Sequence, residues 1–102
     1  MLVNKKYIKI GEGCKVDKRA TIGAAPLRKI KALELKIGQG STVLSGAVIY
    51  AGSSIGEYSI MAHNSVIREE NSIKGNFSLW NNSVVDYGCK IGKNVRSTAM
   101  SI

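Results

Sequence analysis

Every sixth residue from Ile37 to Ile91 is an aliphatic residue or Met, and this period organises the stretch from Ile37 to Arg96 without a gap. The residues two positions before each of these ten are mostly small. The residues three positions after each of them are Gly or Asn in eight of ten cases. Gly and Asn accept the positive φ of tight turns. An amphipathic helix would instead space its apolar residues by about 3.6. The pattern therefore predicts short strands joined by tight turns, with these residues facing inward: Ile37, Val43, Ile49, Ile55, Met61, Ile67, Ile73, Leu79, Val85 and Ile91.

Strand alternation explains why the aliphatic and the small positions occur together. Residues two apart in a strand face the same side, so both positions point into the core. Three strands and three turns close a triangular coil of 18 residues, and successive coils stack by parallel pairing at about 4.8 Å. Ile10, Val16 and Ile22 keep the same step and add an earlier coil. The sequence predicts an all-β fold, a parallel β-helix of about four to five coils in a single domain, residues 1–102.

The spacing from Ile22 to Ile37 exceeds one step of six by nine residues. We expect a loop insertion at about residues 24–35, extruded from one corner of the coil. It either reaches a binding face or packs passively, on the outside of the stacked coils or against a neighbouring subunit. Side chains 18 residues apart should stack, which predicts an ion pair between Arg68 and Asp86 on adjacent coils.

Two groups of motifs carry a resemblance to a known family. The chain resembles the hexapeptide-repeat acyltransferases, whose fold is a left-handed parallel β-helix, in Ile37-Gly38-x-Gly40-Ser41-x-Val43 and Ile55-Gly56-Glu57-Tyr58-Ser59-x-Met61. Two further segments are similar to bacterial and archaeal members of this family, which acetylate sugars. These segments are Ile67-Arg68-Glu69-Glu70-Asn71-Ser72-Ile73 and residues 81–92. The left-handed winding of the helix is implied by the resemblance alone. General rules would instead favour right-handed crossovers.

The resemblance implies an acetyltransferase that uses acetyl-CoA and acts on the amine or hydroxyl of a sugar or nucleotide sugar. It also implies a homotrimer with the active site between subunits, where a histidine takes the proton of the acceptor. His63 is the only histidine and is the candidate base, since imidazole titrates near neutral pH. Glu69, Glu70 and Asp86 are the candidates for orienting it. The alternatives are an exposed turn residue at position 63 and solvated carboxylates, and residues that bind the cofactor are not assigned.

The sequence leaves two other classes of protein open. The γ-type carbonic anhydrases share this fold, but their zinc needs three histidines, so no metal is expected with His63 alone. A catalytically silent trimeric β-helix module is the main alternative to an enzyme. In either case the outward column of Leu44 and Trp80 predicts contact with other subunits, because large exposed aromatics usually mark an interface.

The distribution of charge and hydropathy bears on which partners and which location are expected. Residues 1–36 contain ten Lys or Arg against three acidic residues, a net charge of +7. Such a segment could bind the phosphates of nucleic acid, coenzyme A or a nucleotide sugar. Because it lacks the interleaved aromatics of a base-stacking surface, we expect a solvated face and no nucleic-acid partner. No stretch of about 18 apolar residues occurs, so no membrane association is expected. The N-terminus lacks the apolar core of a signal peptide, and a cytoplasmic location is the default.

The period fails at Ser97, where an aliphatic residue is due. One expectation is that residues 97–102 arose by a shift of reading frame in a longer acetyltransferase gene. If both serines use TCN codons, reading one base earlier restores an aliphatic residue followed by a sequence that can include His, Cys, Asn, Val and Tyr. A truncation at the boundary of the expressed segment and a naturally short protein are the alternatives.

Overall fold

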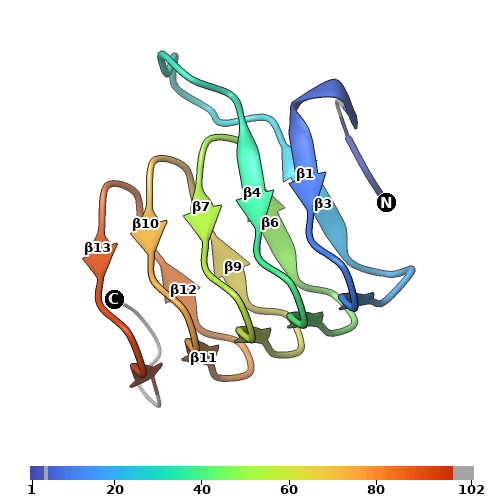
Figure 1. Cartoon of the computed structure of the whole chain (residues 1–102). Coiled ribbons are helices and arrows are strands. Elements are labelled where there is room, and N and C mark those ends of the chain that lie inside the picture. Colours follow the sequence, from blue (N-terminus) through green and yellow to red (C-terminus); the bar gives the residue numbers. More distant parts are fainter. Residues whose placement is uncertain (4, 98–102) are drawn as a thin grey trace.

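The computed structural model describes residues 1–3 and 5–97, and it forms a triangular prism of stacked coils. Three parallel sheets make the three sides, and the chain visits them in turn (Figure 1). Strand partners are neighbours on successive coils, as in the pairing of Ile37 with Ile55 and of Val43 with Met61. The arrangement is consistent with the parallel β-helix that the period of six predicts and with the left hand that the resemblance implies.

The sides are named face 1, face 2 and face 3 in the order in which the chain reaches them. Face 1 consists of β1 (Ile8–Ile10), β4 (Leu35–Ile37), β7 (Ser54–Ile55), β10 (Ser72–Ile73) and β13 (Lys90–Ile91). Face 2 consists of β2 (Lys15–Val16), β5 (Thr42–Val43), β8 (Ile60–Met61), β11 (Ser78–Leu79) and β14 (Arg96–Ser97). Face 3 consists of β3 (Thr21–Ala24), β6 (Val48–Tyr50), β9 (Val66–Ile67) and β12 (Val84–Val85). One short 3-10 helix, η1 (Lys5–Tyr7), precedes β1.

The predicted core is confirmed. All ten aliphatic positions from Ile37 to Ile91 are buried, and Ile22 continues the same column on face 3. The small positions lie beside them, and Ser41, Ser53 and Ser59 are also buried. Their hydroxyl groups accept hydrogen bonds from backbone N–H groups of the next coil, as Ser41 Oγ does from Ser59 at 3.1 Å. Small polar residues are therefore tolerated inside because each one bonds to the neighbouring coil.

The predicted turn positions are also confirmed. Each of the ten residues three positions after the inward residues from Ile37 to Ile91 has positive φ, including Tyr58 at 55° and Glu70 at 59°. These turns form three edges. The edge between faces 3 and 1, which we call the loop edge, contains Gly52, Glu70 and Gly88. The edge between faces 2 and 3, which we call the histidine edge, contains Gly46, Asn64 and Asn82.

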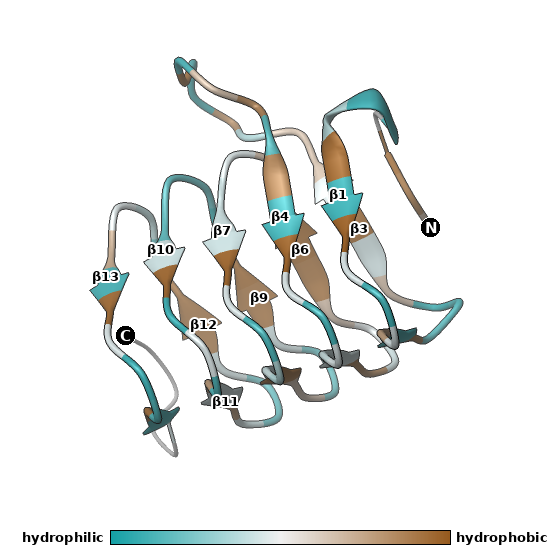
Figure 2. Cartoon of the chain, viewed as in Figure 1, coloured by the Kyte–Doolittle hydropathy of each residue, from teal (hydrophilic) through white to brown (hydrophobic). Residues whose placement is uncertain are grey.

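The inserted segment leaves the prism at the loop edge, between the end of β3 and the start of β4 (Figure 1). It comprises residues 25–34, slightly shorter than expected, because Ala24 still pairs with Tyr50 and Leu35 pairs with Ile8. Figure 2 shows β9 and β12 of face 3 as apolar along their whole length. The outward residues of face 3 include Val48, Val66 and Val84, which are half-buried.

The last described strand keeps the register of the prism. Ser97 pairs with Leu79, and it is buried at the inward position of face 2. The expected change of pattern in residues 98–102 lies outside the described residues. In the part of the chain that is described, no helix is long and apolar enough to cross a membrane.

Candidate functional site

Arg28, which lies on the inserted loop, is the centre of a charged cluster at the loop edge. Its Nε lies 2.6 Å from Oε2 of Glu69, and its Nη2 donates a hydrogen bond to Glu70. The guanidinium also stacks on the ring of Tyr87, with 4.1 Å between Cζ and the ring centroid. Since Glu69 and Tyr87 are 18 residues apart, Arg28 spans two coils of the prism. The loop is therefore tied to coils that follow it by about 40 residues or more in the sequence.

Glu69 is fully buried, with an exposed fraction of 0%. Burial acts to raise the pKa of its carboxyl, but a hydrogen bond from its own backbone N–H, a hydrogen bond from Arg28 and the charges of Arg28 and Arg68 outweigh it. The pKa of Glu69 is therefore lower than the ordinary value, and the carboxylate stays ionised. Its Oε1 accepts no hydrogen bond among the described residues, although Nε of Arg68 lies 3.3 Å away.

The absence of a side chain at Gly52 allows the loop to lie against this edge. A Cβ at Gly52 would come within 2.9 Å of the carbonyl oxygen of Ala32 and 2.5 Å of Cδ1 of Ile30. Only a residue without a side chain allows this approach, and φ at Gly52 is 89°. The next turn is fixed independently, because Nδ2 of Asn71 donates to the carbonyl oxygen of Arg68 at 2.8 Å.

The predicted pairing of Arg68 with Asp86 across adjacent coils is confirmed, with 3.0 Å between Nη1 and Oδ1. Arg68 also lies near the ring of Tyr87, 5.0 Å from Cζ to the centroid. Tyr87 is thus approached by two guanidinium groups, one from the loop and one from the prism. Sequence reasoning did not predict the contacts of Arg28 and Tyr87. The one available signal was Glu70, a glutamate in a turn position that Gly or Asn usually fills.

We expect Glu69→Gln to release the loop. The amide keeps the volume but loses the charge that holds Arg28 and Arg68, and charge-assisted hydrogen bonds are about twice as strong as neutral ones. Local opening of residues 25–34 should become about tenfold more frequent or greater. Trypsin cleavage after Lys29 and Lys31, followed by mass spectrometry, measures this opening. The matched control is Glu70→Gln, which leaves the bond from Arg28 to Glu69 intact.

The same variant should show a defined pH dependence. Because the pKa of Glu69 is lower in the folded chain than in the unfolded chain, its contribution to stability is complete above the ordinary carboxyl range. That contribution is lost as pH falls through the folded value. Urea unfolding from about pH 7 to about pH 3 should therefore show wild type and Glu69→Gln converging toward acid pH. A constant difference across this range would contradict the assignment of the lowered pKa to Glu69.

His63 lies in a turn of the histidine edge, exposed to solvent. Its backbone N–H donates to Oδ1 of Asn81 at 3.0 Å, and its carbonyl oxygen accepts from the N–H of Asn82 at 3.0 Å. Among the described residues the imidazole ring has no hydrogen-bond or ion-pair partner. The backbone of His63 is therefore fixed while both ring nitrogens remain available for proton transfer.

An apolar hollow of about 230 Å³ lies on face 2 beside this turn. Ile60, Leu79 and Trp80 line it together with Asn81, and Arg96 is its charged residue. Asn81 is the side chain that holds the backbone of His63, so the turn borders the hollow. Trp80 is 58% exposed and Ile60 is 44% exposed, so this side of the prism presents apolar surface to solvent.

The candidate base and its candidate orienting carboxylates lie on different edges of the prism. His63 is at the histidine edge, whereas Glu69, Glu70 and Asp86 are at the loop edge. The carboxylates bond to Arg28 and Arg68, and no contact joins any of them to the imidazole among the described residues. Orientation of His63 by these carboxylates remains a prediction, and it would require the loop edge of a second copy.

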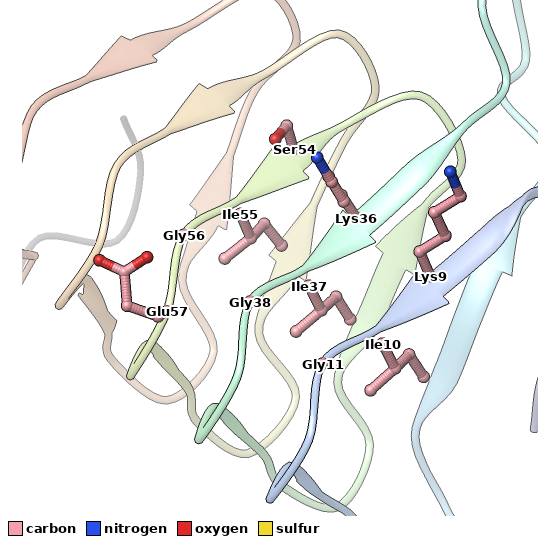
Figure 3. Close-up of a pocket in the computed structure, with 10 residues that line it drawn as sticks. All are labelled: Lys9, Ile10, Gly11, Lys36, Ile37, Gly38, Ser54, Ile55, Gly56 and Glu57. Carbon is pink, nitrogen blue, oxygen red and sulfur yellow. The ribbon is translucent and has the colours of Figure 1, made fainter.

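A second, more polar groove of about 380 Å³ lies on face 1 (Figure 3). Lys9 and Lys36 stand side by side on β1 and β4, and Ser54 follows on β7. Glycines form its floor, and a Cβ at Gly38 would lie 2.4 Å from the backbone N of Glu57. The groove therefore offers two ammonium groups and a hydroxyl above bare backbone, with the carboxylate of Glu57 also in its lining. The two ammonium groups suit a phosphate-bearing ligand.

Comparison with known proteins agrees with this architecture. Residues 35–69 match the sequence model of a family described as bacterial transferase hexapeptide (six repeats). No curated protein and no solved structure matched the chain. The matched segment begins at β4 and ends in the turn after β9, so it covers strands of all three faces. The matched repeat and the triangular coil together support a relationship to the hexapeptide-repeat family.

Proposed function

We propose that this protein is an acetyl-CoA-dependent acetyltransferase that acts on the amine or hydroxyl of a sugar or nucleotide sugar. The observation that carries the proposal is the position of His63 at the rim of an apolar hollow, where its backbone is fixed and its ring has no partner among the described residues. A general base needs this combination of a defined place and an unoccupied nitrogen.

The proposed reaction is a direct transfer. The lone pair of the acceptor nitrogen or oxygen attacks the thioester carbonyl carbon, and the imidazole of His63 accepts the proton of that amine or hydroxyl. The carbon–sulfur bond of acetyl-CoA then breaks, and the CoA sulfur takes the proton back from the imidazolium. The acetyl group moves to the acceptor, and no metal takes part.

The groove on face 1 supports a phosphate-bearing co-substrate. Face 1 lies opposite the histidine edge of the same chain, so in the proposed homotrimer this co-substrate would meet His63 of another copy. Acetyl-CoA carries several phosphate charges, and Lys9 and Lys36 provide two ammonium groups on adjacent strands. Lys9 lies 3.6 Å from Glu34 across an exposed ion pair, so Lys36 is the freer of the two. Because exposed charge pairs are screened by salt, binding should weaken as ionic strength rises.

Titration with acetyl-CoA by calorimetry tests the binding part of the proposal. We expect saturable binding, weakened about tenfold or more by Lys36→Glu, which reverses a charge in the groove. The control is Lys90→Glu on the same face, beyond the groove and next to Ser72. Equal affinity in wild type and Lys36→Glu would remove the groove from the site, and no binding at all would favour a catalytically silent module.

That second candidate, a silent trimeric module, is favoured by one observation. The three carboxylates expected to orient His63 are engaged by arginines on another edge of the same chain. A homotrimer is part of both proposals, because the exposed Trp80 and Ile60 need covering in either case.

A further inference from the structure

At the first coil, the apolar core of the prism is open to solvent. β1, β2 and β3 are the outermost strands of the three sheets at this end. Ile10, at the inward position of β1, is 36% exposed, whereas its partner Ile37 on the next coil is 1% exposed. Val16, at the inward position of β2, is only half-buried. The core is therefore uncovered on the side of faces 1 and 2.

Residues 1–3 cover the end of face 3, and they add apolar surface of their own. Leu2 pairs with Ile22 of β3, and the N–H of Val3 donates to the carbonyl oxygen of Ile22 at 2.8 Å. Ile22 is consequently fully buried. The covering segment is itself apolar (Figure 2), and the side chains of Met1 and Leu2 are largely exposed. Apolar groups from two segments, including Ile10, thus face solvent at this end of the prism.

Cations surround these apolar groups. Residues 5–24 contain six Lys or Arg but only two acidic residues. Lys9 pairs with Glu34, and none of the other five has an ion-pair partner among the described residues. These five, which we call the basic rim, are exposed and lie in η1, on β2 and in the turn between β2 and β3: Lys5, Lys6, Lys15, Lys18 and Arg19. Because these elements belong to different sides of the prism, the rim runs around its end.

Protection of open strand edges explains only part of this pattern. Lysines on edge strands hinder pairing with other chains, but that role does not require exposed apolar residues beside them. Apolar groups inside a rim of cations fit a partner that is negatively charged at its surface and apolar beneath it, and an anionic lipid bilayer is such a partner. A second copy docked end to end would bring like charges together. Contact with the phosphates of nucleic acid would leave the apolar groups unburied.

We propose that this end of the prism docks on the surface of a membrane that contains anionic lipids. The basic rim meets the charged headgroups, and the side chains of Met1, Leu2 and Ile10 enter the boundary between headgroups and acyl chains. Binding of this kind is strengthened both by buried apolar area and by attraction to anionic lipids. It needs no membrane-spanning segment, and the absence of such a stretch was our only reason to expect no membrane association. The proposal does not depend on acetyl transfer.

Co-sedimentation with lipid vesicles tests the docking. The anionic vesicles contain equal parts of phosphatidylcholine and phosphatidylserine, and vesicles of phosphatidylcholine alone are the uncharged comparison. We expect saturable binding to the anionic vesicles that weakens as ionic strength rises. Lys15→Glu combined with Lys18→Glu should weaken it about tenfold or more. The matched control, Lys90→Glu with Lys93→Glu, makes the same change of net charge at the opposite end of the prism and should bind like the wild type.

Leu2→Gln tests the apolar part of the contact. The pairing of Leu2 with Ile22 uses only the backbone, so the fold should be retained while the affinity for anionic vesicles falls about fivefold. Unchanged affinity in Leu2→Gln, equal losses in the two double variants, or no binding of the wild type would each overturn the proposal. Tighter binding to duplex DNA than to anionic vesicles would also overturn it and would identify a nucleic-acid surface instead. None of these variants changes His63 or Lys36, so the result is separate from that of the transferase assay.

Discussion

Ile55→Asp is expected to abolish the folded state at 25 °C. Ile55 is 2% exposed and lies between Ile37 and Ile73 in the inward column of face 1. No buried cation lies in this column, which is made of aliphatic side chains. Burying an unpaired carboxylate there costs several kcal/mol, and a small domain has only about 5–15 kcal/mol of stability in total.

The measurement is urea unfolding followed by circular dichroism, with Ser54→Asp as the matched control. Ser54 is the preceding residue of the same strand, but its side chain faces solvent. Ser54→Asp should unfold cooperatively near the wild-type midpoint, whereas Ile55→Asp should show no transition. Cooperative unfolding of both variants at similar urea concentrations would show that the inward register is wrong.

His63→Ala is expected to lower the rate of acetyl transfer about 100-fold or more, the usual contribution of a general base. The turn should keep its shape, because its hydrogen bonds to Asn81 and Asn82 use only the backbone of His63. The thermal unfolding midpoint should therefore stay close to that of the wild type.

Ser45→Ala is the matched control for His63→Ala. Ser45 occupies the equivalent turn one coil earlier, where its carbonyl oxygen accepts a hydrogen bond from Asn64. Transfer should be unaffected by this change. A wild-type rate in His63→Ala would exclude His63 as the base, whereas a matching loss in Ser45→Ala would point to a disturbed edge rather than to lost proton transfer.

Most of the fold could be predicted from the sequence because each coil repeats the same order of small, inward aliphatic and turn residues. The step of six fixes which side chains face inward, and it also places positive φ at Tyr58 and Glu70, where the residue type alone would not. The period of 18 predicts the pairing of Arg68 with Asp86 for the same reason. Because the coils stack in parallel, residues 18 apart in the sequence are neighbours in space.

The candidate site was less predictable, because it depends on contacts that the period does not contain. The inserted loop has no repeat, so the position of Arg28 follows from ion pairs with residues about 40 positions away. The carboxylates show a different difficulty. Glu69 is six residues after His63, and one step of six moves the chain to the next edge, so closeness in sequence separates them in space.

The central claim is that this chain transfers an acetyl group from acetyl-CoA, and direct detection of the acetylated product tests it most simply. Purified protein is incubated with acetyl-CoA and a panel of amino sugars, sugars and nucleotide sugars, and products are identified by mass spectrometry alongside release of the CoA thiol. The account predicts an acetylated acceptor formed in step with thiol release by wild type and about 100-fold less by His63→Ala. Folded, assembled protein that binds acetyl-CoA and forms no product with any acceptor of the panel would contradict it.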